Sequence, residues 1–343
     1  MGRRYAVGAR SDTGQARERN EDAFGLYMAS PSAVDPAFDA VFVVADGLGG
    51  HSGGDEASRL VVESTQASAL ATEGHGVDAA PWLRRLLDEV HRTLLAEAGG
   101  GDRSQAMGST ATIAVLKGET LTLGHVGDTR CYRLRDGTLT QITEDHSWVA
   151  EQQRAGVLSP EEAAAYEHRN WLTQSLGVGE RLEIATYQET LQVGDRYLLC
   201  SDGLHGLVAD SVVADVLGAE SNPDAAAERL IGLANAAGGT DNITALVFDV
   251  HDVDLAAATL GDGAAVAAPR VRRRGAPQMV LGTLVLIGAA AVAAVRWTRD
   301  SAAPSPDVEQ VSTPDTIPDS TELRVIPGAS SEVRGDSGPN PQE

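Results

Sequence analysis

Cationic side chains are scarce in this sequence of 343 residues, which has 27 Lys and Arg against 49 Asp and Glu and a formal net charge of −22. A surface with that balance repels a phosphate backbone, so the composition excludes sequence-independent binding to nucleic acid. Cysteine is nearly absent, since Cys131 and Cys200 are the only two. Each lies in an apolar strand pattern, which excludes a disulfide scaffold and predicts two buried core thiols in a reducing, cytosolic setting.

Long apolar runs are also scarce. Residues 1–14 contain no apolar core long enough for a signal peptide. Residues 279–295 form one uninterrupted apolar run, whose length lies at the short limit of about 17 residues for a membrane span. A hydrophobic helix docked on the rest of the protein is the alternative interpretation. Because arginines flank the run and Thr283 is its single polar residue, we predict a transmembrane helix over residues 279–297.

The charges on the two sides of this run predict its orientation. Four arginines precede it within ten residues, at positions 270, 272, 273 and 274, whereas within ten residues after it there are only Arg296 and Arg299. Because positive charge is retained on the inner side, we expect a single-pass protein of the cell membrane with residues 1–251 in the cytoplasm. Residues 252–278 are then a linker with a basic cluster, and residues 298–343 an acidic, Pro- and Ser-rich disordered tail.

Residues 1–251 are predicted to form one domain in which groups of strands alternate with pairs of helices. Apolar residues at helical spacing predict helices over 54–71 and 82–98, and from about 210 and 222. Alternating and β-branched runs predict strands over 109–116, 121–126, 131–134, 138–142 and 243–250, with more strands within 182–201. A serine, a proline and two glutamates from Ser159 onward predict a capped helix start. This order indicates an α+β architecture of stacked sheets with helices outside.

A predicted buried strand, residues 41–45, ends at Asp46 and opens into a glycine-rich loop. A rigid carboxylate beside a loop that lets carbonyl oxygens and waters approach is well placed to hold a hard cation. A strand followed by an aspartate-capped turn is the alternative for this stretch alone. The pattern recurs, however, at other predicted strand edges: Glu21 and Asp22, Asp128, Asp202, and Asp241. Dispersed oxygen-only ligands predict a site for magnesium or manganese rather than zinc.

Six short motifs in order carry a family resemblance: Arg17 with Asn20-Glu21-Asp22, residues 44–51 (VADGLGGH), Gly108-Ser109-Thr110, Gly127-Asp128-Thr129-Arg130, Ser201-Asp202-Gly203-Leu204 and Thr240-Asp241-Asn242-Ile243-Thr244. Over essentially all of residues 1–250 the sequence resembles the metal-dependent serine/threonine phosphatases of type 2C (the PPM family), most closely the bacterial membrane-anchored members. The resemblance implies a four-layer α/β/β/α sandwich of two antiparallel sheets flanked by helices. It also implies a metal site in a cleft at one end of the sandwich.

The resemblance assigns a role to each motif residue. Asp46 matches the carboxylate that bridges two metal ions, and the Gly47 carbonyl contributes to the second ion. The other implied ligands are Asp202 and Asp241 at the first ion, Asp22 with Glu21 at the second, partly through water, and Asp128 at a third, weaker ion, with Asn170 nearby. Arg17 matches the arginine that holds the substrate phosphate. Two divalent ions that share one water lower its pKa and stabilise the attacking and leaving oxygens together, and an arginine adds bidentate hydrogen bonds.

One position departs from the animal relatives. They often have a histidine two residues after the bridging aspartate, assigned to protonating the leaving oxygen, where this sequence has Leu48. His51 is a weaker candidate for that role than a metal-bound water. His125, His146 and His168 are interpreted as structural or flap residues rather than metal ligands.

The sequence therefore predicts a membrane-tethered phosphatase for phosphoserine and phosphothreonine on proteins, with substrates made by a cognate serine/threonine kinase. One alternative is a catalytically silent relative that serves as a binding or sensory module. Another is a phosphatase for small phosphomonoesters. Silent relatives usually lose a metal carboxylate or the phosphate arginine, and this sequence keeps all of them.

Overall fold

The computed structural model describes residues 4–30, 36–49, 53–74, 76–97 and 107–251. Within these residues, no helix is both long enough and apolar enough to cross a membrane. The predictions for the linker, the span, the tail and His51 concern residues outside the described part.

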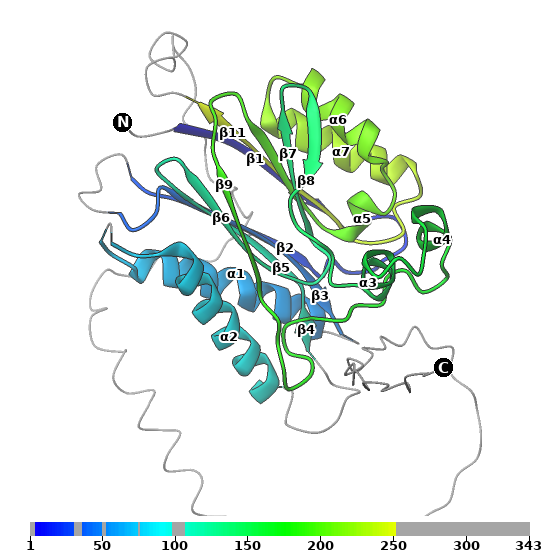
Figure 1. The fold of residues 1–343 in the computed structure, drawn as a ribbon, viewed down its shortest axis with the longest axis horizontal. Helices are drawn as coiled ribbons and strands as arrows, with labels where there is room; N and C mark the ends of the chain where they lie inside the picture. Colours follow the sequence, from blue (N-terminus) through cyan, green and yellow to red (C-terminus); the bar gives the residue numbers. More distant parts are fainter. Residues whose placement is uncertain (1–3, 31–35, 50–52, 75, 98–106, 252–343) are drawn as a thin grey trace, which may run out of the picture. The chain divides into compact units, whose positions relative to one another are not determined.

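Two antiparallel sheets pack face to face, as predicted (Figure 1). The five-stranded sheet has the order β1 (Arg4–Asp12), β11 (Ile243–His251), β10 (Arg196–Cys200), β7 (Arg130–Arg135) and β8 (Thr138–Gln141). The six-stranded sheet has the order β2 (Asp22–Met28), β3 (Ala40–Leu48), β5 (Ala111–Lys117), β6 (Thr120–Val126) and β9 (Ala185–Thr190), with β4 (Gly108–Ser109) paired to β3. The antiparallel sandwich expected from the sequence is confirmed.

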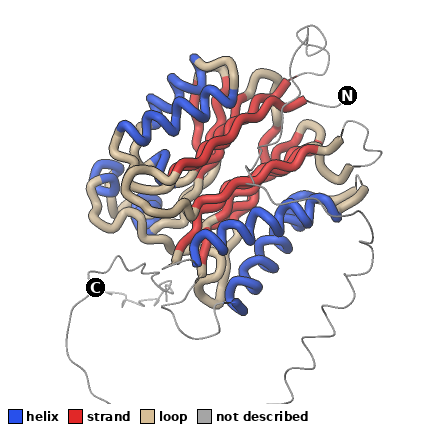
Figure 2. The backbone as a smooth tube through the Cα atoms, turned by 180° about the vertical axis from the view of Figure 1, so that it is seen from behind, coloured by secondary structure: helices blue, strands red, loops and turns tan. Residues whose placement is uncertain are grey.

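Helices form the two outer layers (Figure 2). The helices α1 (Gly53–Ala71) and α2 (Ala79–Glu97) cover the six-stranded sheet, and α6 (Asp210–Ala219) and α7 (Pro223–Ala236) cover the five-stranded sheet. Three short helices lie beside one end of the sheets: α3 (Trp148–Arg154), α4 (Pro160–Ala164) and α5 (Asp202–His205). The predicted serine cap is present, since the Ser159 hydroxyl accepts from the Glu162 amide and the Glu162 carboxylate accepts from the Ser159 amide.

The alternation of β3 explains why its whole run is buried. Val41, Val43 and Ala45 pack under α1 and α2, whereas Phe42 and Val44 point into the layer between the sheets. There the Phe42 and Phe248 rings lie 5.0 Å apart. Cys131 and Cys200 are both buried, as predicted, in the middle layer and under α6–α7 respectively.

The strand β1 was not predicted from the sequence. It pairs with β11 along its whole length, from Arg4 opposite His251 to Asp12 opposite Ile243. Its sequence is short of large apolar residues, because α7 approaches it closely. A side chain at Gly8 would collide with the backbone of Asp224 at the start of α7. Tertiary packing thus selects a residue here that local strand propensity disfavours.

A buried ion pair joins β10 to β11. The Arg196 guanidinium donates to both carboxylate oxygens of Asp249, at 2.6 and 2.8 Å, and each residue is 8% exposed. The same guanidinium donates to the Leu217 carbonyl in the last turn of α6 at 2.6 Å, and to carbonyls of the α6–α7 connection, Ser221 at 3.3 Å and Glu220. Arg196 therefore fixes the α6–α7 layer on its sheet.

Candidate active site

The predicted site residues lie on separate segments that meet at one end of the sandwich. Asp22 begins β2 and lies directly opposite Asp46 of β3 in the antiparallel register, so both side chains leave the same face of the sheet. Asp202 begins α5 at the end of β10. Asp241 directly precedes β11, and Asp128 lies in the turn between β6 and β7.

The prediction that the strand ends at Asp46 is wrong. The strand β3 continues to Leu48, because Gly47 and Leu48 pair with Ser109 and Gly108 of β4. Asp46 is therefore held within a ladder, and its amide donates to the Thr110 hydroxyl at 3.0 Å. At Gly47 a side chain would collide with the carbonyl of Gly54, so this crossing of chains requires glycine.

Burial and mutual repulsion raise the pKa values of these carboxyls. Burial raises the pKa of Asp46 well above its usual range, and the charges of Asp22, Asp202, Asp128 and Asp241 raise it further. Burial raises the pKa of Asp22 to about 7 and that of Asp202 to about 6, and the charge of Asp241 contributes to the rise in both pKa values. The pKa of Asp128 is raised by burial and then by Asp202. A cluster of like charges with low water access requires positive charge to stay ionised.

The donor set fits hard divalent cations. In the part of the chain that the structure describes, two buried carboxylate oxygens, Asp22 Oδ1 and Asp202 Oδ1, lack a hydrogen-bond partner. Such burial is costly unless an ion or water meets these oxygens. No group of three or more His, Cys, Asp or Glu side chains in the described residues is arranged as a ready ligand set for one ion. Magnesium keeps several waters and uses one or two carboxylates per ion, so spaced oxygens suit it and similar ions.

Arg17 reaches the site, but a carboxylate holds it there. Its Nη2 donates to Asp241 Oδ2 at 2.9 Å, and its side chain is 48% exposed. The structure thus brings the predicted phosphate ligand beside a predicted metal ligand. Glu21 lies next to Asp22, and its backbone is fixed by Asn242, whose Oδ1 accepts from the Glu21 amide at 2.8 Å. Burial raises the pKa of the Glu21 carboxyl.

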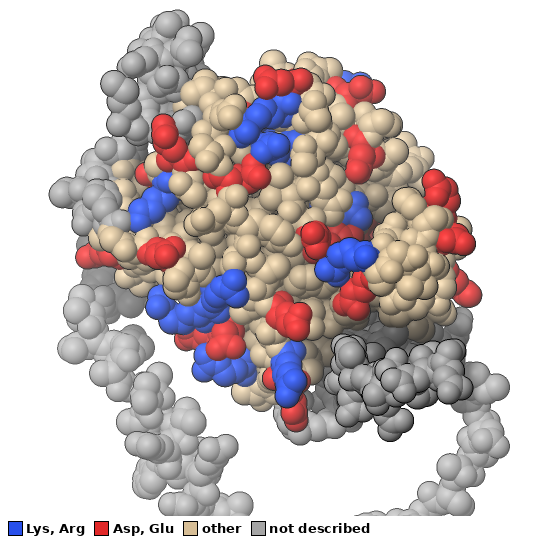
Figure 3. All heavy atoms as spheres, viewed as in Figure 1, with Lys and Arg blue, Asp and Glu red and all other residues tan. Residues whose placement is uncertain are grey.

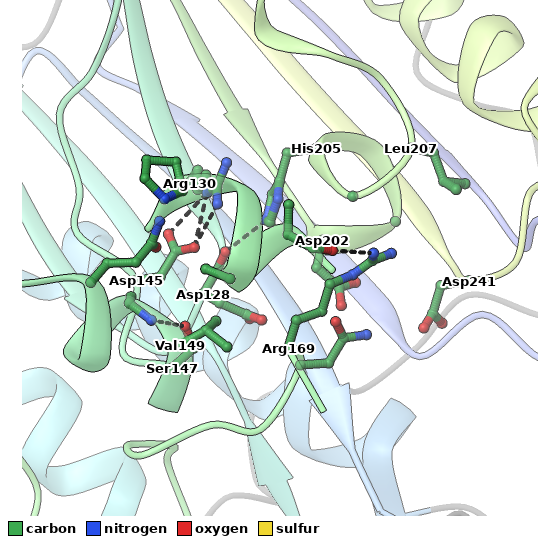
Figure 4. Close-up of a pocket in the computed structure, with 18 of the residues that line it drawn as sticks. Asp128, Arg130, Asp145, Ser147, Val149, Arg169, Asp202, His205, Leu207 and Asp241 are labelled. Carbon is green, nitrogen blue, oxygen red and sulfur yellow. Dashed lines mark hydrogen bonds and ion pairs between the residues drawn. The ribbon is translucent and has the colours of Figure 1, made fainter. Parts of the chain in front are cut away.

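A cavity of about 340 Å³ opens beside these carboxylates (Figure 4). Its lining includes Asp128, Asp202 and Asp241, together with residues of α3, α4 and the loop that follows α4. Asn170, expected near Asp128, does line this cavity. Arg169 lines it as well and donates through Nη1 to the Ala164 carbonyl at 3.2 Å.

Sequence reasoning missed the residues that hold the Asp128 turn. Arg130 donates to both oxygens of Asp145, through Nε at 2.9 Å and through Nη2 at 2.7 Å. The His205 Nε2 donates to the Asp128 carbonyl at 2.9 Å and so joins α5 to this turn (Figure 4). The sequence signal was that Arg130 belongs to one of the six motifs and that His205 directly follows another, which does not specify the partners of either residue.

The three histidines interpreted as structural or flap residues are packed among neighbours. His125 is buried, its Nε2 donates to the Glu144 carbonyl at 3.0 Å, and its Nδ1 faces the Thr112 hydroxyl at 2.9 Å. The His146 ring lies 4.8 Å from that of His125. His168 stacks on Trp171 at 4.2 Å in the segment that follows α4.

His125 makes folding stability sensitive to acid. Burial, and then the charge of His146, lower its pKa to about 3, so the folded protein binds fewer protons than the unfolded chain between about pH 3 and 6.5. Above pH 6.5 this group does not reduce the unfolding free energy. As the pH is lowered below 6.5 the unfolding free energy falls, by about 2 kcal/mol at pH 5. We expect His125→Gln to flatten the fall in urea-unfolding free energy from pH 7 to pH 5. Equal slopes for both proteins would contradict this assignment.

Comparison with known proteins gives one consistent set of relatives. A family model described as Protein phosphatase 2C matches residues 14–237, which include every predicted site residue except Asp241. The "Serine/threonine phosphatase stp" of Listeria welshimeri is 34% identical over 245 residues, 70% of this chain and 94% of that protein. The "Serine/threonine protein phosphatase PstP" of Mycobacterium tuberculosis is 37% identical over 268 residues, 76% of this chain and 48% of that protein.

A solved structure adds a metal-bound example. The catalytic domain of the serine/threonine protein phosphatase PstP, in complex with two manganese ions, matches with a TM-score of 0.62 and 34% identity. The match covers 72% of this chain and 99% of the other.

Proposed function

This chain belongs to the protein phosphatase 2C family, and on that premise we propose that it hydrolyses phosphoserine and phosphothreonine on proteins. The observation that carries the proposal is the convergence of Asp22, Asp46, Asp128, Asp202 and Asp241 from separate segments into one partly buried, mutually repelling cluster beside a cavity. Divalent cations compensate such a cluster of carboxylates and accept its oxygens as ligands.

The chain's own residues have distinct tasks in this proposal. Asp46 would bridge two ions, either Mn²⁺ or Mg²⁺, with Asp202 and Asp241 at one and Asp22, Glu21 and the Gly47 carbonyl at the other. When bound, the pair supplies an activated water and positive charge opposite the phosphate. Arg17 would exchange its bond with Asp241 for bonds to the phosphoryl oxygens, as a guanidinium fork favours. The residues of α3 and α4 that line the cavity would exclude water and orient the peptide.

Two alternatives remain in view. A catalytically silent binding module is disfavoured because every carboxylate of the set and Arg17 are present. Small phosphomonoesters could enter the cavity, and so substrate class must be measured. On the face seen in Figure 3, acidic and basic side chains of the described residues are interspersed, so we expect peptide selection to depend on the cavity more than on a charged patch.

The test is hydrolysis of a phosphopeptide panel by the full chain, with and without Mn²⁺. We expect phosphate release from phosphoserine and phosphothreonine peptides only with the metal, and little from phosphotyrosine. Metal-bound protein that binds the peptides without releasing phosphate would favour the silent module. Faster turnover of small phosphomonoesters than of every peptide would favour that alternative instead.

Asp128 is proposed to hold a third, weaker ion. It lines the cavity on the opposite side of Asp202 from Asp241 in Figure 4. We expect Asp128→Ala to remove one of three Mn²⁺ binding events in titration calorimetry and to lower turnover without abolishing it. Loss of all bound manganese would place Asp128 in the central pair.

The membrane anchor is a further proposal, supported by the apolar run 279–295 and its flanking arginines. Residues 1–251 would then face the cytoplasm, where phosphoproteins made by a cognate serine/threonine kinase occur. Protease added to spheroplasts should remove a tag on residues 298–343 and leave the domain intact. Digestion of the domain would reverse the orientation, and recovery of the whole chain in the soluble fraction would remove the span.

A further inference from the structure

One oxygen of Asp22 is bound by two hydroxyl groups, which the proposed ligand roles do not explain. The Ser201 hydroxyl donates to Asp22 Oδ2 at 2.6 Å, and the Thr244 hydroxyl donates to the same oxygen at 2.7 Å. Ser201 and Thr244 are both fully buried, at 0% exposure, and Asp22 is 8% exposed. No water competes readily for these bonds, so they determine how the carboxylate is oriented.

The direction of every bond in this network follows from its ends. The Asn20 amide nitrogen can only donate, and it donates to Ser11 Oγ at 2.7 Å. Ser11 Oγ lies 2.8 Å from Thr244 Oγ1. Since the Thr244 proton is committed to the carboxylate, Ser11 must donate to Thr244. The chain of donors therefore runs one way, from Asn20 through Ser11 and Thr244 to Asp22.

The position of Ser201 supports a role beyond helix capping. It is the N-cap residue of α5, where a serine hydroxyl usually accepts a bond from the first turn, yet this hydroxyl makes no capping bond. It donates to Asp22 and accepts from the Thr244 amide at 3.0 Å. The two hydroxyl groups that hold Asp22 Oδ2, those of Ser201 and Thr244, form a clamp on this carboxylate. The clamp also joins the two sheets, because Asp22 belongs to β2 whereas Thr244 belongs to β11.

The other oxygen, Asp22 Oδ1, is buried and has no hydrogen-bond partner among the described residues. With Oδ2 occupied by two donors, Oδ1 is the only atom of the carboxylate left to meet a cation or its water. We infer that Ser201 and Thr244 are positioning residues, which hold Asp22 so that Oδ1 is presented to the metal. This inference rests on the proposed function only in taking a divalent ion as the occupant of the site. Groups that orient a metal ligand typically change metal affinity about 10–100-fold when they are removed.

The test measures manganese affinity of the full chain by titration calorimetry. Thr244→Val keeps the shape of the side chain and removes the hydroxyl, and we expect Mn²⁺ affinity at the tightest sites to fall by about 10-fold or more. Thr244→Ser restores the hydroxyl and should restore most of the affinity. Thr65→Val is the matched control, because Thr65 is a buried threonine of α1 whose hydroxyl donates to the Val61 carbonyl at 2.7 Å, outside this network.

Two results would overturn the inference. One is wild-type affinity in Thr244→Val, and the other is equal loss in Thr244→Ser and Thr244→Val, which would assign the effect to packing. Should Thr244→Val fail to fold, Ser201→Ala removes the second donor and is judged by the same criterion against Thr65→Val. Because binding is measured apart from turnover, a wild-type protein that binds manganese but hydrolyses no phosphopeptide would refute the proposed function and leave this inference standing.

Discussion

Asp46→Asn is expected to lower phosphopeptide turnover at saturating Mn²⁺ by a factor on the order of 10³ or more. The change keeps the shape of the side chain but removes the charge that would be shared between two ions. Metal stabilisation of a phosphoryl transition state amounts to several kcal/mol, and each 1.36 kcal/mol is tenfold in rate. Arg17→Ala removes hydrogen bonds to the phosphate and to Asp241 but leaves all the proposed metal-binding carboxylates in place, so its expected loss is smaller, about 10–100-fold.

Asp46→Asn is expected to stabilise the metal-free protein, although it lowers turnover. After burial, the charges of Asp22 and Asp202 are the largest of those that raise the pKa of Asp46, so replacing this carboxyl with a neutral amide should raise the melting temperature in chelator at pH 8. Loss of activity with a raised melting temperature separates a catalytic defect from unfolding. Full activity of Asp46→Asn with Mn²⁺, or of the wild type in chelator, would refute the metal mechanism.

Arg196→Met is expected to cost about 3–5 kcal/mol of unfolding free energy, because it leaves the buried Asp249 carboxylate without its partner. It also leaves the carbonyls at the α6–α7 connection without their donor. Urea denaturation at neutral pH measures the loss.

An exposed arginine provides the control. Arg92 pairs with Asp88 one helical turn away at 2.8 Å, with side chains 66% and 55% exposed, and Arg92→Met should cost less than about 0.5 kcal/mol. The double variant Arg196→Met with Asp249→Leu should recover much of the loss, since neither buried charge then remains. If Arg196→Met and Arg92→Met lose the same unfolding free energy, the buried pair contributes no more to stability than the exposed pair.

Much of the fold followed from periodicity. The helices α1, α2, α6 and α7 and the central strands have strong apolar patterns, and the structure contains all of them. The strand β1 was missed because its identity depends on pairing with β11 and on α7 packing against Gly8. Local sequence does not contain that information.

The residues of the site were easier to predict than their contacts. Carboxylates at strand edges are visible in sequence because an acidic residue beside a buried strand is unusual. The bond from Arg17 to Asp241, the clamp on Asp22 and the His205 bond to the Asp128 turn join residues far apart in the chain. Such partners depend on the three-dimensional register of two sheets, which no single stretch of sequence specifies.

The pairing of the first described strand with the last one has a consequence for how the domain folds. In the described chain β11 lies between β1 and β10, and β1 pairs with β11 alone. The five-stranded sheet therefore closes only after nearly the whole domain has been synthesised, and it does so across a very long loop. Closing that loop costs chain entropy before any contact repays it, which makes folding slow. Until β11 is in place, the edges of β1 and β10 that pair with it are unpaired. The nascent domain is therefore most prone to aggregation at that stage.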